Sequence, residues 1–250
     1  MYKNLIFDLY GTLLDVKTAD DSDEAFRKLA KFYAFRGAKY TAGKLQTEFR
    51  RRMDAQLRSR SKTIYDKTGE MITYPEIDVL PIFKQLFEEK KVAADDMLVE
   101  LTANWFRVTV TRRLAIYPGV LELFKRWKEQ GRKLYLLSNA QRVYTEGELK
   151  ATGLESWFDG ILLSSDYGCR KPDPIFFNEL QRQFHLSPLD SIMIGNERKS
   201  DIAVACAAGI DSVLLVTDPA LAEPIDGIES TYTVADGDFR KLIDIPELFC

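Results

Sequence analysis

From residue 116 to the end of the sequence, short apolar segments alternate with segments in which apolar residues recur at helical spacing. The apolar segments have the length of strands, and the segments between them are long enough for helices. A chain that alternates in this way forms right-handed β-α-β units, which build a mostly parallel sheet with helices on both faces. We therefore predict an α/β, doubly wound fold. The predicted strands are 133–137, 160–163, 191–194, 212–216 and 231–234. The predicted helices are 118–131, a segment ending at Gly153, 175–185 and 202–208.

Another strand is predicted at residues 5–7, an apolar run of the kind found in strands buried on both faces. Asp8 follows this run at once, and Gly11 and Thr12 then reverse the chain. A carboxylate at the C-terminal edge of a parallel strand stands where open α/β sheets bind their ligands. An isolated Asp at such a place is read as a turn residue, but three more polar clusters follow predicted strands. They are Ser138-Asn139, Arg170-Lys171-Pro172-Asp173-Pro174, and Gly195-Asn196-Glu197 with Asp201.

Residues 16–115 differ in character, because apolar residues there recur mostly at helical spacing. No alternating strand pattern stands out, and Gly69 and residues 74–78 divide the region into pieces. We predict a bundle of helices inserted after the first strand. The predicted domains are a discontinuous core, 1–15 and 116–250, and a helical insertion, 16–115. The residues at helical spacing are Phe26, Leu29, Ala30, Tyr33, Phe49, Met53, Leu57, Phe83, Phe87, Leu98, Leu101 and Trp105.

Composition argues against several classes of protein. Of the 250 residues, 46% are hydrophobic, which is enough for a sizeable core. The 35 basic and 38 acidic residues give a net charge of −3, so neither nucleic acid nor an anionic membrane is expected as a general partner. No apolar run approaches the ~20 residues of a membrane span, and we see no signal peptide.

Cysteine and histidine are scarce in the sequence. Cys169, Cys206 and Cys250 are scattered and odd in number, which fits a reduced cytosolic compartment best. They lack the spacing of metal ligands, and His185 is the only histidine. A zinc site or a Ser-His-Asp triad is therefore nearly excluded, because His185 would have to serve alone.

The four polar clusters, in their order and spacing, resemble the four motifs of the haloacid dehalogenase-like (HAD) hydrolase superfamily. The first reads Phe-Asp-Leu-Tyr-Gly-Thr-Leu from position 7, and the third reads Lys-Pro-Asp-Pro from position 171. Each motif alone is weak evidence for the superfamily, but the four motifs in this order are highly specific for it. The resemblance covers the whole predicted core, and the helical insertion resembles the family's type-1 cap. It implies a Rossmann-like core with an inserted helical cap domain.

The resemblance implies catalytic roles for several of these residues. Asp8 would be the nucleophile, attacking phosphorus or carbon and leaving an ester that water then hydrolyses. Lys171 would neutralise charge on the substrate and keep Asp8 ionised. The implied catalytic set is Asp8, Tyr10, Ser138 and Lys171. The implied set for binding a small anionic substrate is Gly11, Thr12 and Asn139, with help from the Ser138 hydroxyl.

In the phosphatases of this superfamily, Mg²⁺ bridges the nucleophile and the phosphate. Magnesium takes oxygen ligands, one or two of them carboxylates. The implied ligands are the Asp8 carboxylate, the Tyr10 backbone carbonyl and the fourth motif. Asn196 stands where the family's first acid stands, and it can ligate without charge. Glu197 and Asp201 are spaced like the family's shorter acidic pair, so the predicted metal set also includes both.

Tyr10 departs from the phosphatase pattern, which has a second Asp there to protonate the leaving alkoxide. A Tyr with a pKa near ~10 is a poor substitute at neutral pH. The L-2-haloacid dehalogenase branch carries Tyr at this place, because halide leaves without an acid or a metal. The fourth motif argues against that branch, which has a Ser-Ser-Asn-x-x-Asp type sequence there. Neither branch is fully satisfied.

We therefore expect a hydrolase that works through an aspartyl ester on a small anionic substrate, with Mg²⁺-dependent phosphate-ester hydrolysis favoured. The alternatives are a metal-independent 2-haloacid dehalogenase and a non-catalytic binding or regulatory protein on a degenerate HAD scaffold. Basic residues of the insertion allow two readings, a solvated helix face or an anion-binding lid. They are Arg50, Arg51, Arg52, Arg58, Arg60, Lys62, Arg112 and Arg113.

Overall fold

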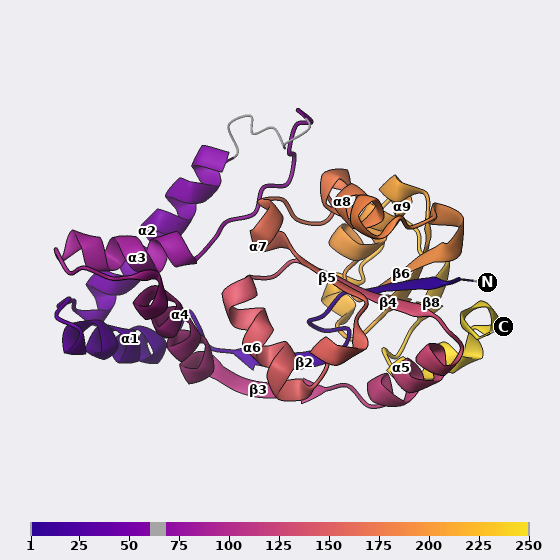
Figure 1. Ribbon diagram of the computed structural model, residues 1–250, viewed down its shortest axis with the longest axis horizontal. Coiled ribbons are helices and arrows are strands. Elements are labelled where there is room, and N and C mark those ends of the chain that lie inside the picture. Colours follow the sequence, from indigo (N-terminus) through magenta and orange to yellow (C-terminus); the bar gives the residue numbers. More distant parts are fainter. Residues whose placement is uncertain (1, 61–68, 250) are drawn as a thin grey trace.

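The computed structural model describes residues 2–60 and 69–249. It has two lobes (Figure 1), one built around a six-stranded sheet (the sheet lobe) and one built by four helices (the helical lobe). The sheet has the strand order β5-β4-β1-β6-β7-β8, and every neighbouring pair is parallel. The predicted α/β fold is confirmed. Its strands are β1 Asn4–Phe7, β4 Lys133–Ser138, β5 Gly160–Leu163, β6 Ser191–Gly195, β7 Asp211–Leu215 and β8 Tyr232–Val234.

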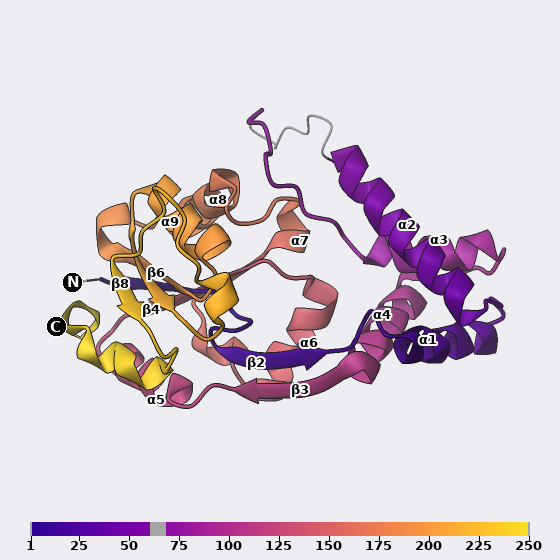
Figure 2. The ribbon, with the colours of Figure 1, turned by 180° about the vertical axis from the view of Figure 1, so that it is seen from behind.

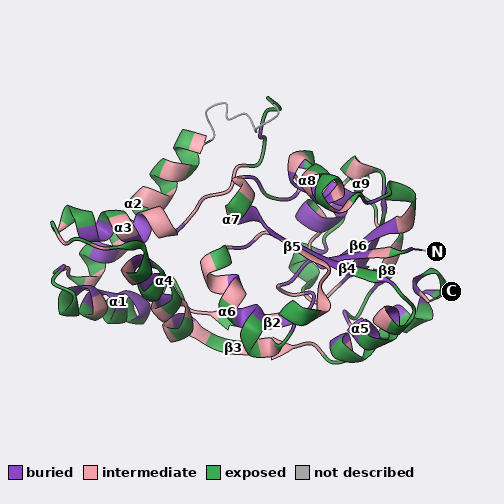
Figure 3. Cartoon of the chain, in the orientation of Figure 1, coloured by how far each residue is buried: buried purple, intermediate pink, exposed green. Residues whose placement is uncertain are grey.

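Helices cover both faces of this sheet, because each strand buries side chains alternately on either side. In β1, Leu5 and Phe7 join a cluster with α5, while Ile6 joins a cluster with α8 and α9. Figure 3 shows the strands as the buried centre of the lobe. The helices are α5 Val120–Glu129, α6 Arg142–Thr152, α7 Ser164–Tyr167, α8 Pro174–Phe184 and α9 Ala203–Ala208. Single-turn elements are η1 Glu155–Trp157, η2 Pro188–Asp190, η3 Arg198–Ile202, η4 Pro219–Leu221, η5 Phe239–Asp244 and η6 Pro246–Leu248.

The helical lobe has a core of its own. Aromatic rings from its helices pack edge to face, with ring centroids 5.3 Å apart for Phe49 and Phe83 and 5.8 Å apart for Phe26 and Phe49. This separate core is consistent with the proposed division into a core domain and a helical domain, whose boundaries stay a prediction. The four helices are α1 Asp23–Phe35, α2 Ala42–Arg60, α3 Leu80–Glu89 and α4 Asp96–Val110.

The prediction that residues 16–115 hold no strand is wrong at both ends of the region. Strands β2 (Leu14–Thr18) and β3 (Thr111–Ile116) pair antiparallel and connect the two lobes (Figure 2). The ribbon pairs Leu14 with Ile116 across the whole insertion. Each strand contributes only two or three apolar residues to the core, which is too few to show the alternation typical of a strand. Its partner strand is also distant in sequence.

Helix α4 contains Leu98, Leu101 and Trp105, as their spacing predicts. It also buries Val99, Ala103 and Phe106, whereas Leu101 is 47% exposed. One local prediction about helices is wrong. Pro118 is not in the first turn of a helix, because Gly119, with φ +89°, is the N-cap of α5.

One segment of the insertion packs back onto the sheet lobe. The Glu76 amide donates to the Gly168 carbonyl at 2.9 Å, and the Arg170 amide donates to the Tyr74 carbonyl at 2.9 Å. The Asp173 carboxylate accepts from the Thr73 and Tyr74 amides at 2.7 and 2.9 Å. Residues 73–76 therefore form a second attachment between the lobes, separate from the β2–β3 ribbon. Within the described ranges, no helix is both long and apolar enough to cross a membrane.

Candidate active site

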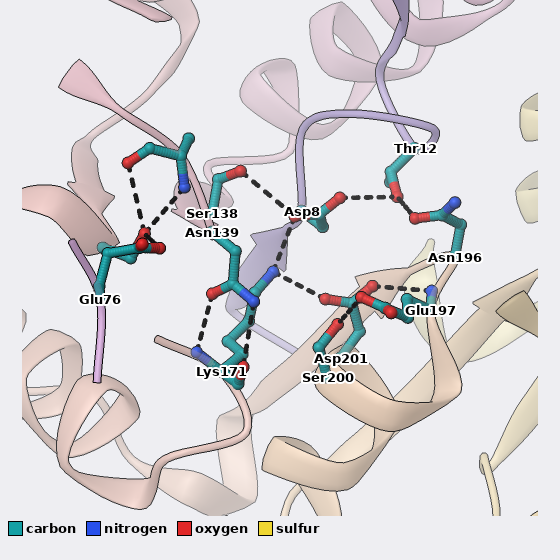
Figure 4. Close-up of polar contacts among 12 residues, drawn as sticks. Asp8, Thr12, Glu76, Ser138, Asn139, Lys171, Asn196, Glu197, Ser200 and Asp201 are labelled. Carbon is teal, nitrogen blue, oxygen red and sulfur yellow. Dashed lines mark hydrogen bonds and ion pairs between the residues drawn. The ribbon is translucent and has the colours of Figure 1, made fainter. Parts of the chain in front are cut away.

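Asp8 lies at the C-terminal end of β1, at the centre of the sheet, where its amide donates to the Ile194 carbonyl of β6 at 3.0 Å. Its side chain is close to three predicted site residues (Figure 4). Lys171 Nζ is 2.7 Å from Asp8 Oδ1, Ser138 Oγ donates to the same oxygen at 3.3 Å, and Thr12 Oγ1 donates to Oδ2 at 3.4 Å. The residue is 8% exposed. One carboxylate oxygen is thus held by a cation, and the other keeps room for a further contact.

Lys171 is shared between two buried carboxylates. Its Nζ lies 2.7 Å from Asp8 Oδ1 and 2.7 Å from Asp201 Oδ1. Burial alone would lower the pKa of Lys171, but the two carboxylates raise it above its ordinary value. Burial raises the pKa of Asp201, and Lys171 opposes this. The cluster has two carboxylates and one ammonium group, so it carries an excess of negative charge that a further cation or a proton would neutralise.

The third motif, which carries Lys171, does not follow a strand directly, contrary to our prediction. We expected Lys171 to follow a strand, but helix α7 stands between β5 and the loop 168–173. Asn139 holds this loop: its Nδ2 donates to the Lys171 carbonyl at 3.0 Å, and its Oδ1 accepts from the Lys171 amide at 2.8 Å. Asn139, predicted to bind substrate, has its whole amide engaged in positioning the lysine. Sequence reasoning missed Asp173, whose ties to residues 73–74 anchor the same loop.

Gly11 is required by its surroundings. It has φ +80°, and a Cβ at this position would lie 2.3 Å from Asn196 Nδ2. Only glycine adopts this conformation without strain and lets the first and fourth motifs touch. As a result, Thr12 Oγ1 is 3.4 Å from Asp8 Oδ2 and 3.3 Å from Asn196 Oδ1. The Thr12 hydroxyl therefore links the Asp8 carboxylate to the Asn196 amide (Figure 4).

The predicted metal ligands are only partly brought together. Asp8 and Asn196 both contact Thr12 Oγ1, so one carboxylate and one neutral amide oxygen lie on the same side of the site. Glu197 instead accepts a hydrogen bond from Ser200 at 2.6 Å, and Asp201 Oδ2 accepts one from the Glu197 amide at 3.0 Å. Within the described ranges, no group of three His, Cys, Asp or Glu side chains could hold a metal. Magnesium sites usually have one or two protein carboxylates, and this site offers one. The donor set therefore fits Mg²⁺ if the substrate supplies further oxygen ligands.

Replacing Asn196 with Asp should tighten Mg²⁺ binding by about 10–100-fold, because it adds a second charged oxygen beside Asp8 Oδ2. Without Mg²⁺, the variant should melt at a lower temperature than the wild type, since the two carboxylates repel each other. Added Mg²⁺ should reverse that loss. Thermal melting and calorimetric titration, each with and without Mg²⁺, measure both effects. Asn196→Ala is the control, and it should show no gain. If the melting temperature of Asn196→Asp did not depend on Mg²⁺, residue 196 would not be a ligand of the metal.

Tyr10 points toward helix α6. Its hydroxyl donates to Glu148 Oε2 at 2.6 Å and lies 2.9 Å from Thr145 Oγ1. Arg107 of α4 donates from Nε to Glu148 Oε1 at 2.6 Å, and its guanidinium lies 5.7 Å from the centre of the Tyr10 ring. Burial and the Glu148 charge raise the pKa of Tyr10 above its ordinary value. The phenol is thus committed to Glu148 and is a poor proton donor.

Sequence reasoning missed Glu148, Thr145 and Arg107. Glu148 is 6% exposed, yet a single Glu on an amphipathic helix carries no sequence signal of burial. The one available signal was Tyr10 itself, a buried phenol that requires a polar partner.

Most of the basic residues in the insertion have structural partners. Arg51 and Arg52 both pair with Glu48 on α2, at 2.9 and 2.6 Å. Arg113 pairs with Asp15 at 2.5 Å. Arg51 and Arg113 have exposed side chains, as on a solvated face, whereas the Arg52 side chain is largely buried. Arg50 pairs with Asp21 and lines the cavity between the lobes. Arg60 donates to the Glu76 carbonyl at 2.5 Å, and Lys62 lies outside the described residues.

Comparison with known proteins places this geometry in a family. A family model described as haloacid dehalogenase-like hydrolase matches residues 2–209. Phosphoglycolate phosphatase from Vibrio vulnificus is 29% identical over 146 residues, which are 58% of this chain and 63% of the relative. The match therefore spans less than two thirds of that relative. Glyceraldehyde 3-phosphate phosphatase from Methanothermobacter thermautotrophicus is 25% identical over 223 residues, 89% of each chain.

Solved structures show the same fold. The 2-haloacid dehalogenase from Pseudomonas syringae has a TM-score of 0.69 at 18% identity, over 100% of both chains. The Bacillus subtilis protein YfnB, solved bound to magnesium, has a TM-score of 0.53 at 21% identity, over 98% of both chains. The family model covers most of the chain, and its residues 2–209 include Asp8, Lys171 and Asp201. The chain belongs to the haloacid dehalogenase-like hydrolase family.

Proposed function

We propose that this protein hydrolyses phosphate esters through an ester formed on Asp8. The observation that carries the proposal is the contact of Lys171 with Asp8 at 2.7 Å, at the carboxyl edge of a parallel sheet. The pairing places a buried cation where an anionic group would arrive. The sequence relatives named as phosphatases support phosphorus as the centre attacked.

The chain's own residues supply most of the chemistry. A carboxylate oxygen of Asp8 attacks phosphorus, and the bond to the leaving oxygen breaks. The Ser138 and Thr12 hydroxyls and the Lys171 ammonium stabilise the charge on the phosphoryl oxygens. Water then attacks the phosphorus of the Asp8 ester, which releases phosphate and restores the carboxylate.

Magnesium would be held by the Asp8 carboxylate, the Asn196 amide oxygen and the Tyr10 backbone carbonyl. Bound there, it would neutralise negative charge on the phosphate. Because only one of these ligands is charged, we expect weak binding that the substrate strengthens.

The test is turnover on two panels of substrates. One measures phosphate release from phosphate esters with and without Mg²⁺, and the other measures halide release from 2-chloro acids without metal. Phosphate release stimulated by Mg²⁺ is the expected result. Halide release without phosphate release would replace the proposal with its alternative. No release from either panel would favour a non-catalytic protein.

Dehalogenation is the second candidate, and the direction of Tyr10 favours it. The phenol is bonded to Glu148, so the described residues around Asp8 offer no free acid for an alkoxide. A halide leaves as a stable anion and needs none.

Replacing Tyr10 with Asp should raise the rate of alkyl phosphate hydrolysis by about 10–100-fold, because it supplies the missing general acid. The neighbouring Glu148 charge would favour the protonated form of the new carboxyl group. Aryl phosphates, whose leaving groups need little help, should gain less than about threefold. Tyr10→Phe is the matched control and should gain nothing with either ester. Equal rates for Tyr10→Asp and Tyr10→Phe on alkyl phosphates would contradict the prediction.

A further inference from the structure

We propose that the substrate is the phosphate ester of a neutral aromatic alcohol, whose apolar ring system occupies the cavity between the lobes. This inference rests on the proposed phosphatase function and deepens it. Three observations carry it: the size and lining of the cavity, the balance of charge around it, and the engagement of Tyr10.

The cavity has a volume of about 840 Å³. Asp8 itself does not line it, but Tyr10 and Asn139, which do, are close in sequence to Asp8 and Ser138. Tyr10, Asn139 and Arg170 form its end at the sheet lobe. A pocket of this size lies toward the upper end of the roughly 300–1,000 Å³ found for ligand sites, far more than a two-carbon phosphate fills. Its lining comes from α1, α2 and α4 of the helical lobe and from α6 and the loop 139–141 of the sheet lobe; Figure 1 shows α6 at the side of the sheet lobe that is nearer to α4. The apolar residues of its wall are Phe26, Phe49, Met53, Leu57, Ile77, Val79, Phe106, Val110, Ala140 and Tyr144.

The charges around the cavity do not favour a second anionic group on the substrate. Three arginines and three acidic residues line it. At the far end, Arg50 donates from Nε to Asp21 at 3.0 Å, and Asp20 stands beside this pair. Arg107 is neutralised by Glu148 at 2.6 Å. Among the described residues, the Arg170 side chain makes no ion pair, and it precedes Lys171, where the phosphate would lie. Among the described residues that line the cavity, the arginine without an ion pair thus lies at the phosphate end.

The position of Tyr10 selects the kind of alcohol. Since its hydroxyl donates to Glu148, the leaving oxygen receives no proton from it. A phenol has a pKa near ~10, like tyrosine itself, and leaves as a phenolate. An alkyl alcohol, with a pKa close to the ~16 of water, leaves poorly without an acid. In the proposed step, a carboxylate oxygen of Asp8 bonds to phosphorus, and the electron pair of the broken bond departs on the phenolate oxygen. Solvent water protonates that oxygen afterwards.

The experiment compares 2-naphthyl phosphate with phosphoglycolate, in wild type and in two matched variants. Met53→Trp fills the cavity, whereas Met97→Trp adds the same ring at a site on α4 that is 78% exposed. We expect wild-type kcat/KM to be about 100-fold higher for 2-naphthyl phosphate. Met53→Trp should lower that value about tenfold and change the phosphoglycolate value less than twofold. Met97→Trp should leave both unchanged.

A binding measurement separates this inference from the proposed function. Fluorescence titration of 2-naphthol, the product alcohol, needs no turnover, and Met53→Trp should weaken its binding about tenfold. Preference for phosphoglycolate, or an equal effect of Met53→Trp on both esters, would overturn the aromatic substrate while leaving the phosphatase intact. Failure of both esters, with 2-naphthol still bound in the cavity, would instead overturn the phosphatase proposal. If Met53→Trp does not fold, Met53→Ala, which enlarges the cavity, should keep full activity on 2-naphthyl phosphate.

Discussion

Replacing Asp8 with asparagine should lower phosphate release by about 10⁴–10⁶-fold, because the amide cannot form the ester on which turnover depends. The substitution keeps the shape of the side chain, and Lys171 retains Asp201 at 2.7 Å. The fold should therefore remain. Steady-state assays of freshly purified protein, with melting temperatures measured in parallel, test this result.

Asp15→Asn provides the matched control. Asp15 lies on β2 and pairs with Arg113 at the surface, away from the described contacts of Asp8. This variant should keep wild-type turnover. If Asp8→Asn retained more than about 1% of the activity in preparations free of contaminating phosphatase, Asp8 would not be the nucleophile.

Replacing Lys171 with methionine should cost about 3–5 kcal/mol of stability and abolish turnover, because it leaves buried carboxylates without their shared cation. Urea unfolding measures the loss. The loss of stability should be smallest at acidic pH. Removing Lys171 takes away a group that lowers the pKa of Asp201, so the folded-state pKa rises further above the unfolded value of ~3.9. The folded state then binds the proton more tightly, and stability falls as pH rises through the folded-state pKa.

The double variant Lys171→Met, Asp201→Asn keeps this prediction testable if the single variant does not fold. Removing the unpaired Asp201 charge should restore about half of the lost stability without restoring turnover. Two outcomes would count against a structural role for the cation: a single variant within about 1 kcal/mol of wild type, or a double variant less stable than the single one.

Much of the sheet lobe could be predicted from the sequence because its strands are buried on both faces. Runs such as residues 5–7 and 191–194 are continuous and apolar, and such runs are readable without a partner. The order of the polar clusters then placed Asp8, Ser138 and Asn196 at one edge, since parallel strands end together. Lys171 was found through its Lys-Pro-Asp-Pro motif, although the chain reaches that place through α7.

The partners of the site residues could not be predicted, because they are fixed by the tertiary and local geometry of the folded chain. Glu148 meets Tyr10 from 138 positions away, and nothing in its helix distinguishes it from a solvated Glu. Glu197 looked like a metal ligand by spacing, but the irregular turn of η3 brings Ser200 to it instead. The β2–β3 ribbon was not predicted, because its two strands are brought together only when the insertion between them has folded.

The two attachments between the lobes restrict how the helical lobe can move. The β2–β3 ribbon lies along one side of the molecule, and residues 73–76 meet the loop 168–173 on the other side (Figures 1 and 2). A rotation of the helical lobe about the line that joins these two places would have to break a third contact between the lobes, the pair of Arg107 on α4 with Glu148 on α6 at 2.6 Å. Arg170 and Lys171 sit at one pivot of that axis. Opening and closing would therefore widen or narrow the cavity while the cation beside Asp8 stays in place.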